Sequence, residues 1–316
     1  MIINKKFEFN FDISEPKQKN NIVVFFLSSK ENKKNDLLTF PYAMKNNLVE
    51  IEEIGKKGFI RNLRLINRSE KKILVLGSEI LTGNKLKQDR VVDESIIVSE
   101  NTYATLRVSC CEKNRWSPSV SEDISLSETL LFSKARTNNA EDIYNSQKND
   151  QFRVWEDIDE KFEENEVRSI TNSIEEIYRK RKKNVEEIVK YFQPGDDDIG
   201  VVLGIGSRLV SIDVFSSNIH LKEYLPRLIR SVALDSFKRT GYKTFLKKKD
   251  VYKFLRTIDH SDKRIYNINK EYLGNYIRFN DDLVTGTMLS LDKKIIHFYA
   301  SLKELSTPPD FKSKVA

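Results

Sequence analysis

The hydrophobic period changes once along this chain, and this change limits the folds that the chain can adopt. The first half carries short apolar runs of strand length, together with segments in which apolar and polar residues alternate as they do in half-buried strands. Glycines separate several of these segments, at places where a turn costs little. The segments are 22–27, 60–66, 73–76 and 103–108. The first half is therefore predicted to be rich in β-structure.

The clearest helix follows that half. Apolar residues recur at steps of three and four from Ile170 to Phe192, with one gap at Arg181, and mark a single apolar stripe. A Pro–Gly pair at 194–195 ends the pattern. The other faces carry a basic run at 179–183 beside many glutamates, which favours a solvated helix face over a nucleic-acid patch. We predict a long connecting amphipathic helix here.

The second half is predicted to mix helices and strands. An acidic turn precedes two apolar stretches that favour a hairpin, and later stretches predict two helices and a closing strand pair. These elements are a hairpin at 201–206 and 209–215, helices at 220–238 and 251–255, and strands at 283–291 and 295–302. The fold class is therefore α+β: a β-rich N-terminal half, a long connecting amphipathic helix and an α+β C-terminal half.

The domain organisation is less marked in the sequence. Residues 118–151 are polar and carry few large apolar side chains, so this stretch is expected to be a long loop, a lid or a linker. We divide the chain into a β-rich domain at 1–117, a connecting loop, lid or linker at 118–156 and an α+β half at 157–316. The two halves can also pack as one domain.

Composition indicates a soluble, cytoplasmic protein. Hydrophobic residues make up 39% of the chain, which is enough for a core, and no stretch approaches the roughly 20 apolar residues of a membrane helix. The first seven residues lack the apolar run of a signal peptide. Two adjacent cysteines cannot join distant segments, which fits a reducing compartment. The net charge of +7 suits a phosphate-bearing ligand or, less favoured, nucleic acid.

The densest polar cluster runs from Gly77 to Trp116. Its parts are the segments 77–83, 85–90 and 110–116, and each lies next to a predicted strand, so sheet pairing could bring them together. The candidate catalytic residues are Glu79, Gln88, Asp89 and Glu112, and the candidate ligand-binding residues are Lys87, Arg90, Arg115 and Trp116. Such a set suits an anionic ligand that carries a ring.

The residue types in this cluster define the expected roles. Glu79 or Glu112 can act as a general base, with Gln88 orienting the ligand or a water molecule. Arginines such as Arg115 offer a planar fork that matches phosphate oxygens, and Trp116 could stack on a nucleobase or a sugar. The alternative is that the carboxylates and arginines pair with each other in a buried ionic network, with the tryptophan in the core.

Several sharper motifs are absent. The segment 77–85 lacks the spacing and the final Gly-Lys-Ser/Thr of a P-loop, and Gly-Ile-Gly at 204–206 lacks the third glycine of the dinucleotide fingerprint. The three histidines are scattered and there is one cysteine pair, so we expect no metal site, and the sequence leaves the cofactor unknown. A nucleophile made of Cys110 or Cys111 with His297 is a further alternative, although buried cysteines are usually inert.

Five segments together resemble a known family. They are Gly-Ser-Glu-Ile-Leu-Thr-Gly at 77–83, Lys-Gln-Asp-Arg-Val at 87–91, Cys-Cys-Glu-Lys-Asn-Arg-Trp at 110–116, Gln-Phe-Arg-Val-Trp at 151–155 and Asp-Val-Phe at 213–215. In this combination the chain resembles the ARPP-1 domain, which is named for its association with ADP-ribosylglycohydrolases and rhodanese-like phosphatases. The resemblance also includes His297 near the end, and it covers about residues 20–302.

The resemblance implies a ligand class. It suggests a bacterial protein that binds or processes a phosphorylated nucleotide of the NAD and ADP-ribose class, and, if it is an enzyme, a hydrolase of such a nucleotide. The chain departs from the family pattern in two places. Ser78 precedes Glu79 where many members carry paired acids, and the segment 84–87 is about two residues longer than usual. Glu112 would have to replace the missing acid, or the site would only bind.

Two other functions fit the sequence. The first is a non-enzymatic sensor or protein-interaction module of a bacterial stress or defence system, in which the polar cluster is structural. The second is nucleic-acid binding through the basic runs at 179–183 and 247–249, which would depend strongly on salt.

Overall fold

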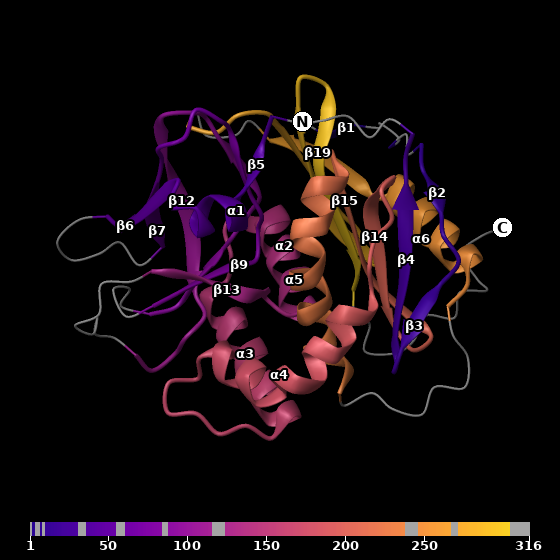
Figure 1. The fold of residues 1–316 in the computed structure, drawn as a ribbon, viewed down its shortest axis with the longest axis horizontal. Coiled ribbons are helices and arrows are strands. Elements are labelled where there is room, and N and C mark those ends of the chain that lie inside the picture. Colours follow the sequence, from indigo (N-terminus) through magenta and orange to yellow (C-terminus); the bar gives the residue numbers. More distant parts are fainter. Residues whose placement is uncertain are drawn as a thin grey trace.

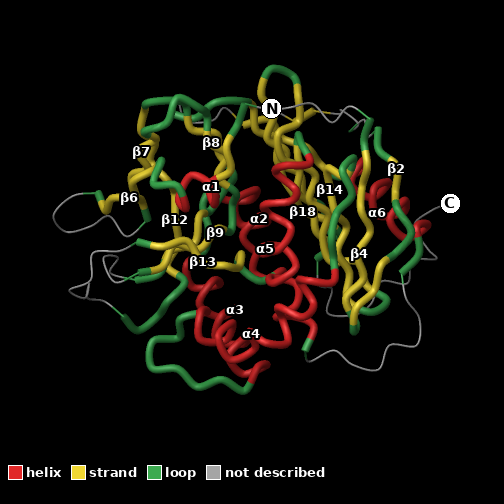
Figure 2. The backbone as a smooth tube through the Cα atoms, in the orientation of Figure 1, coloured by secondary structure: helices red, strands yellow, loops and turns green. Residues whose placement is uncertain are grey.

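The computed structural model describes residues 2–3, 7, 10–30, 36–54, 61–83, 88–115, 124–237, 246–266 and 271–303 of the 316-residue chain. Within these ranges the strands form three sheets, and helices lie between and beside them (Figures 1 and 2). This confirms the predicted α+β class. None of the described helices is long and apolar enough to cross a membrane.

The largest sheet has ten strands, and all of its pairings are antiparallel. In sheet order, it contains β1 (Ile2–Ile3), β16 (Asp262–Tyr266), β17 (Asn275–Asn280), β18 (Val284–Leu291), β19 (Lys294–Leu302), β15 (Arg208–Phe215), β14 (Asp198–Ile205), β4 (Ile22–Ser28) and β2 (Asp12–Ile13), while β3 (Lys17–Lys19) also pairs with β4. The apolar run of β4 is buried along its length against β14, so an early segment of the chain completes a sheet built mainly by the second half.

Two smaller sheets come from the first half of the chain. The six-stranded sheet contains, in order, β13 (Ser125–Leu130), β9 (Glu79–Thr82), β10 (Arg90–Val92), β12 (Thr102–Cys110), β7 (Asn62–Asn67) and β6 (Val49–Glu53), and the three-stranded sheet contains β11 (Ile96–Val98), β8 (Ile73–Val75) and β5 (Leu38–Thr39). The first half is therefore rich in β-structure, as its alternating pattern predicts.

The helices connect the sheets. They are α1 (Phe40–Lys45), α2 (Ser133–Ser146), α3 (Gln151–Asn165), α4 (Ile174–Tyr191), α5 (Asn218–Ser236) and α6 (Lys248–His260). Helix α5 contacts both β13 and β14, and α2 contacts β17 and β18. Figure 1 shows α2 and α5 between the smaller sheets and the ten-stranded sheet, with α3 and α4 at one end of this layer. The residues carried by α2 and α5 are thus held between the two groups of strands.

The predictions that rest on a regular spacing of apolar residues are confirmed. The connecting helix is α4, although Ile170 precedes it and is 90% exposed. The predicted hairpin is β14 and β15, the second helix is α5, and the closing pair is β18 and β19. The basic run on α4 is largely exposed, and its Lys182 pairs with Glu128, as on a solvated helix face.

The prediction of a loop within 118–156 is wrong for the described part of this segment. Its described part forms β13, α2 and the first turns of α3. Sequence periodicity missed α2 because the residues that this helix buries include Arg136, Thr137 and Asn139 rather than a stripe of large apolar side chains. Arg136 and Asn139 are held by partners far away in sequence, Asp213 and Asp93. The predicted domain boundaries at 117 and 156 stay predictions.

The central helix α5 gives a test of this packing. Leu228 is fully buried in the main apolar core, whereas Ile219 on the same helix is 57% exposed. Leu228→Ala should lower the free energy of unfolding by about 2–5 kcal/mol, because it removes apolar contacts and leaves a cavity. Ile219→Ala should change it by less than about 0.5 kcal/mol. Urea unfolding measures both values, and equal losses in the two variants would contradict the assigned faces of α5.

Candidate functional site

Sheet pairing brings part of the predicted polar cluster together. Strand β10 pairs antiparallel with β12, and Arg90 lies opposite Cys110 in this register. The backbone N–H of Cys111 donates to the carbonyl of Asp89 at 3.0 Å and extends the pairing beyond both strands. Asp89 and Glu112 therefore meet just outside the ladder, as the sequence predicts.

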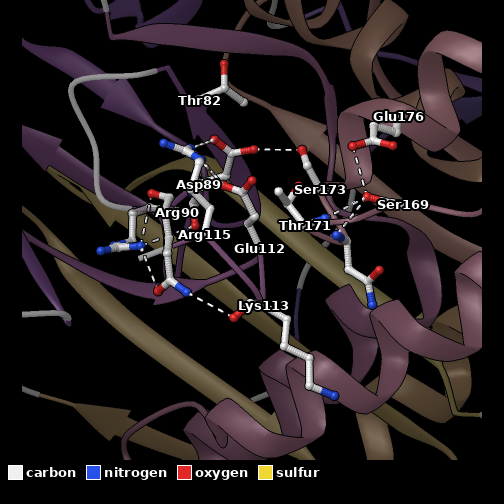
Figure 3. A network of polar contacts seen from close by, with 12 residues as sticks. Thr82, Asp89, Arg90, Glu112, Lys113, Arg115, Ser169, Thr171, Ser173 and Glu176 are labelled. Atoms are coloured by element: carbon white, nitrogen blue, oxygen red, sulfur yellow. Dashed lines mark hydrogen bonds and ion pairs between the residues drawn. The ribbon is translucent and has the colours of Figure 1, made fainter. Parts of the chain in front are cut away.

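Asp89, Glu112 and Arg115 form one ionic network (Figure 3). Nη2 of Arg115 lies 3.0 Å from Oδ1 of Asp89 and 2.7 Å from Oε2 of Glu112. The hydroxyl of Ser173, the residue before α4, donates to Oδ2 of Asp89 at 2.8 Å. Burial, followed by the nearby Glu112 carboxylate, raises the pKa of Asp89 to about 6. The network therefore fastens the start of α4 to Asp89, at the N-terminal end of β10.

Arg90 and Gln88 support the same corner. The side chain of Arg90 is almost fully buried, donates to the Gln88 carbonyl at 2.9 Å and lies 3.9 Å from the Glu53 carboxylate. The Gln88 amide donates to the Lys113 carbonyl at 3.3 Å. Nη1 of Arg90 and the Gln88 amide thus have partners, whereas Nε of Arg90 has none among the described residues. The two other predicted residues, Lys87 and Trp116, lie outside the described residues.

Glu79 belongs to a different group of charges. It is fully buried on β9 and pairs with Arg227 of α5. Burial raises the pKa of Glu79, although the guanidinium groups of Arg227 and Arg136 oppose the shift. The structure thus brings Asp89, Glu112 and Arg115 into contact and gives Glu79 a separate partner. The pairing corresponds to the ionic-network alternative; the chemical roles of these residues stay a prediction.

A small cavity lies at the other end of β10. The space available to the centres of water molecules is about 30 Å³, and none of the six predicted site residues that the structure describes lines the cavity. Its polar wall includes Ser95 from the turn between β10 and β11, Arg136 and Asn139 from α2, and His297 and Tyr299 from β19. The cavity therefore lies where α2 meets strands of both halves.

A buried hydrogen-bonded series of side chains borders this cavity. Ser95 Oγ lies 3.2 Å from Nδ1 of His297, and Nε2 of the same ring lies 3.3 Å from Oδ1 of Asp213 on β15. Arg136 donates to that Oδ1 at 2.8 Å. All four side chains are at most 4% exposed. We call Ser95, His297 and Asp213 the relay.

The charge states of the relay follow from these contacts. Burial alone would raise the pKa of Asp213, but the Arg136 guanidinium and His297 outweigh it and lower the pKa. Burial lowers the pKa of His297, and Asp213 only partly opposes this shift. At neutral pH the relay therefore contains an ionised carboxylate and a neutral imidazole.

Reasoning from the sequence did not select the relay. Its members are far apart in sequence, and each is one polar residue within or beside an apolar strand. One signal was available: Asp213 and His297 interrupt the apolar runs 209–215 and 295–300, and buried polar residues are rare enough to need a partner. This signal identifies Asp213 and His297 as residues that need a partner, but it does not show that they contact each other.

The cysteine alternative is not supported by the geometry. Cys110 and Cys111 are buried and free, and burial raises the pKa of both thiols, which disfavours the reactive thiolate. Both ring nitrogens of His297 already contact Ser95 and Asp213. Within the described residues, no group of three or more His, Cys, Asp or Glu side chains could hold a metal ion.

The raised pKa of Asp89 predicts a pH dependence of stability. Its folded pKa of about 6 exceeds the ordinary value of 3.8, so the folded state binds more protons between these values. The free energy of unfolding should therefore rise as pH falls from 7 to about 4.5, with Asp89 contributing at most about 3 kcal/mol. In Asp89→Asn this rise should be smaller, as measured by urea unfolding at both pH values. The exposed Asp197→Asn serves as the control, and an unchanged rise in Asp89→Asn would contradict the assignment.

Comparison with known proteins gives one match. The family model ARPP-1, described as the ARG and Rhodanese-Phosphatase-superfamily-associated Protein domain, matches residues 10–301. No curated protein and no solved structure matches the chain. The family match includes both the ionic network at one end of β10 and the relay at the other. Since it extends over nearly the whole sequence, the chain belongs to the ARPP-1 family.

Proposed function

We propose that this protein binds a phosphorylated nucleotide of the NAD and ADP-ribose class, with the ribose in the cavity beside Ser95 and His297. The observation that carries this proposal is a pair of polar atoms without partners. Among the described residues, neither Nε of Arg136 nor Oδ1 of Asn139 has a hydrogen-bond partner, and both residues are buried and line the cavity.

Unpartnered buried groups favour a ligand that bonds to them. Leaving a buried donor or acceptor without a partner costs about 1–3 kcal/mol, and a ligand that supplies the missing bond recovers much of this free energy. Arg136 offers a donor and Asn139 an acceptor, so the two together suit a group that both accepts and donates. A sugar hydroxyl does both.

The balance of charge around the cavity also favours an uncharged group inside. Arg136 is paired with Asp213, and Glu94 on the cavity wall is paired with Arg107 and Arg278. Asp93 also lines the cavity, and burial raises its pKa to about 6, so it is mostly ionised at pH 7. These three carboxylates balance the three guanidinium groups, so a phosphate inside would displace an existing ion pair. The ribose can enter without this cost, while the phosphates stay at the mouth of the cavity.

Arg107 is the residue that we assign to the phosphates. Its side chain is 37% exposed, and it contacts Glu94 on the cavity wall. A partly exposed guanidinium can bind phosphate oxygens through its planar fork without losing all of its own hydration. Its contact with Glu94 keeps it beside the cavity.

The cavity must widen when the ligand binds. About 30 Å³ holds on the order of two water molecules, which is less than a ribose needs. Ser95 lies on a turn and Arg136 and Asn139 lie on a helix, so a small movement of either element enlarges the space. We assign the Asp89, Glu112 and Arg115 network to holding β10 in place during this movement.

The family supports the ligand class. Its name records an association with the ARG and the rhodanese-phosphatase superfamilies, and ADP-ribosylglycohydrolases act on ADP-ribose groups. An association of this kind bears on the metabolic setting rather than on the reaction. It agrees with a site that receives a ribose and leaves phosphates outside.

Calorimetric titration with ADP-ribose tests the proposed function. The wild-type protein should bind ADP-ribose, whereas inorganic pyrophosphate, which lacks a ribose, should give no saturable heat. Asn139→Ala should weaken binding about 10-fold or more, because one hydrogen bond to the ribose is lost. Absence of binding by the folded wild-type protein would contradict the proposal.

The neighbouring asparagine provides a matched control. Asn138 lies on the same helix but donates to the Asp157 carboxylate and does not line the cavity. Asn138→Ala should therefore bind ADP-ribose as the wild type does. If both variants lose affinity equally, the effect comes from α2 as a whole and the cavity assignment is wrong.

A further inference from the structure

We infer that Ser95 is a nucleophile that His297 activates and Asp213 orients, and that the protein hydrolyses a carboxylic ester carried by a ribose hydroxyl of its nucleotide. This inference rests on the proposed function for its substrate and on the relay for its chemistry. Nucleophile, base and orienting carboxylate each lie within hydrogen-bond range of the next, at 3.2 and 3.3 Å.

The protons along the relay have only one consistent order. The ionised Asp213 can only accept, so Nε2 of the neutral imidazole carries the proton and donates to it. Nδ1 is then an acceptor, and the Ser95 hydroxyl donates to it. The Gly77 N–H donates to Ser95 Oγ at 2.9 Å, which completes the series. The serine proton therefore already points at the base.

The ring nitrogens are used in the reverse of the familiar order. In the well-known serine hydrolases the serine contacts Nε2 and the aspartate contacts Nδ1. Here the serine contacts Nδ1, because Nε2 of His297 on β19 faces Asp213, which lies diagonally across the ladder on the paired strand β15. Both nitrogens of imidazole have the same basic chemistry, so this order leaves the role of His297 as general base unchanged.

Gly77 fixes the position of the nucleophile. Its N–H donates to Ser95 Oγ at 2.9 Å and holds the hydroxyl oxygen beside the His297 ring. A side chain at position 77 would lie 3.1 Å from the backbone of Glu94 and Ser95. Glycine therefore permits the close approach that brings this N–H to the nucleophile.

The substrate class follows from the chemistry of the relay and the shape of the site. Serine nucleophiles activated in this way transfer acyl groups. The proposed ribose position places a sugar oxygen next to Asn139 and Arg136, on the cavity wall that Ser95 shares. An acyl group on that oxygen would have its carbonyl carbon near Ser95.

The reaction balances with water as the second reactant. Ser95 Oγ attacks the carbonyl carbon, and its proton moves to Nδ1 of His297. The bond between the carbonyl carbon and the ribose oxygen breaks, and His297 returns the proton to that oxygen. Water then attacks the carbonyl carbon of the acyl-serine and gives a proton to His297. The bond between that carbon and Ser95 Oγ breaks, and His297 passes the proton to Ser95 Oγ. The products are a carboxylic acid and the free ribose hydroxyl.

A fluorophosphonate probe tests the nucleophile without a nucleotide. Ser95 should displace the fluoride and gain the phosphonyl group, which peptide mass spectrometry locates. The wild type should be labelled at Ser95, Ser95→Ala should not be labelled, and Ser211→Ala, a buried serine on β15 outside the relay, should be labelled as the wild type. A folded wild type without the adduct overturns the inference.

Ester hydrolysis separates this inference from the proposed function. p-Nitrophenyl acetate tests the relay alone, and an acetyl ester of ADP-ribose tests the relay together with the ligand class. Ser95→Ala and His297→Gln should lower kcat roughly 10³-fold or more on both esters. Turnover of p-nitrophenyl acetate alone would support the relay and contradict the nucleotide. Binding of ADP-ribose without Ser95-dependent turnover of either ester would support the nucleotide ligand and contradict the catalytic role of the relay.

Asp213 is a positioning residue and needs a separate readout. The charged groups that act on His297 are Asp213 and Arg136, with His220 also nearby in its electrostatic surroundings. Asp213 raises the pKa of His297 against the effect of burial. Asp213→Asn should therefore move the lower pKa in the pH profile of kcat/KM for p-nitrophenyl acetate to a smaller value. A purely structural role would lower the amount of folded protein and leave this pKa unchanged.

Discussion

The contact between Arg136 and Asp213 fastens α2 to the ten-stranded sheet and also sets up the relay. Arg136 comes from α2 and Asp213 from β15, and both side chains are buried. Burying two charges is costly unless each is well paired, and removing one partner of such a pair costs about 3–5 kcal/mol. Oδ1 of Asp213 also accepts a hydrogen bond from His297, so the carboxylate that holds α2 in place also orients the imidazole.

The same polar residues explain why α2 is ordered. Helices usually gain their stability in proteins from an apolar face. Helix α2 also buries Arg136 and Asn139, and Asn139 donates to the Asp93 carbonyl at 3.0 Å. The bonds of these two residues reach a strand and a turn beside a strand. The position of α2 therefore depends on the residues that line the cavity, and changes there affect both fold and site.

How far the sequence predicts this fold depends on how each element is stabilised. Helices α4 and α5 and the hairpin β14–β15 bury apolar residues at regular spacing, so the pattern reveals them. Helix α2 has no such spacing, and a polar stretch is read as a loop. Its folding depends on partners far away in sequence, such as Asp213, which is 77 positions from Arg136 and which no local pattern records.

The residues of the candidate site also differ in how far the sequence predicts their contacts. Asp89 and Glu112 lie beside β10 and β12, which only the short strand β11 separates in the sequence, so their approach through sheet pairing could be predicted. Ser95 and His297 are 202 positions apart and meet only because two sheets pack around α2 and α5.

The balance of buried charge sets what chemistry the cavity can carry out. Glu79 is neutralised by Arg227, Asp213 by Arg136, and Glu94 by Arg107 and Arg278. Charges that are already paired and hydrogen-bonded do not need to reorganise as a reaction proceeds, and this preorganisation is what stabilises a transient charge. Asp213 would stabilise an imidazolium formed at His297, whereas the positive charge of Arg136 would repel it and favour return of the proton. The cavity is thus suited to moving one proton between neutral groups, and poorly suited to holding an ion.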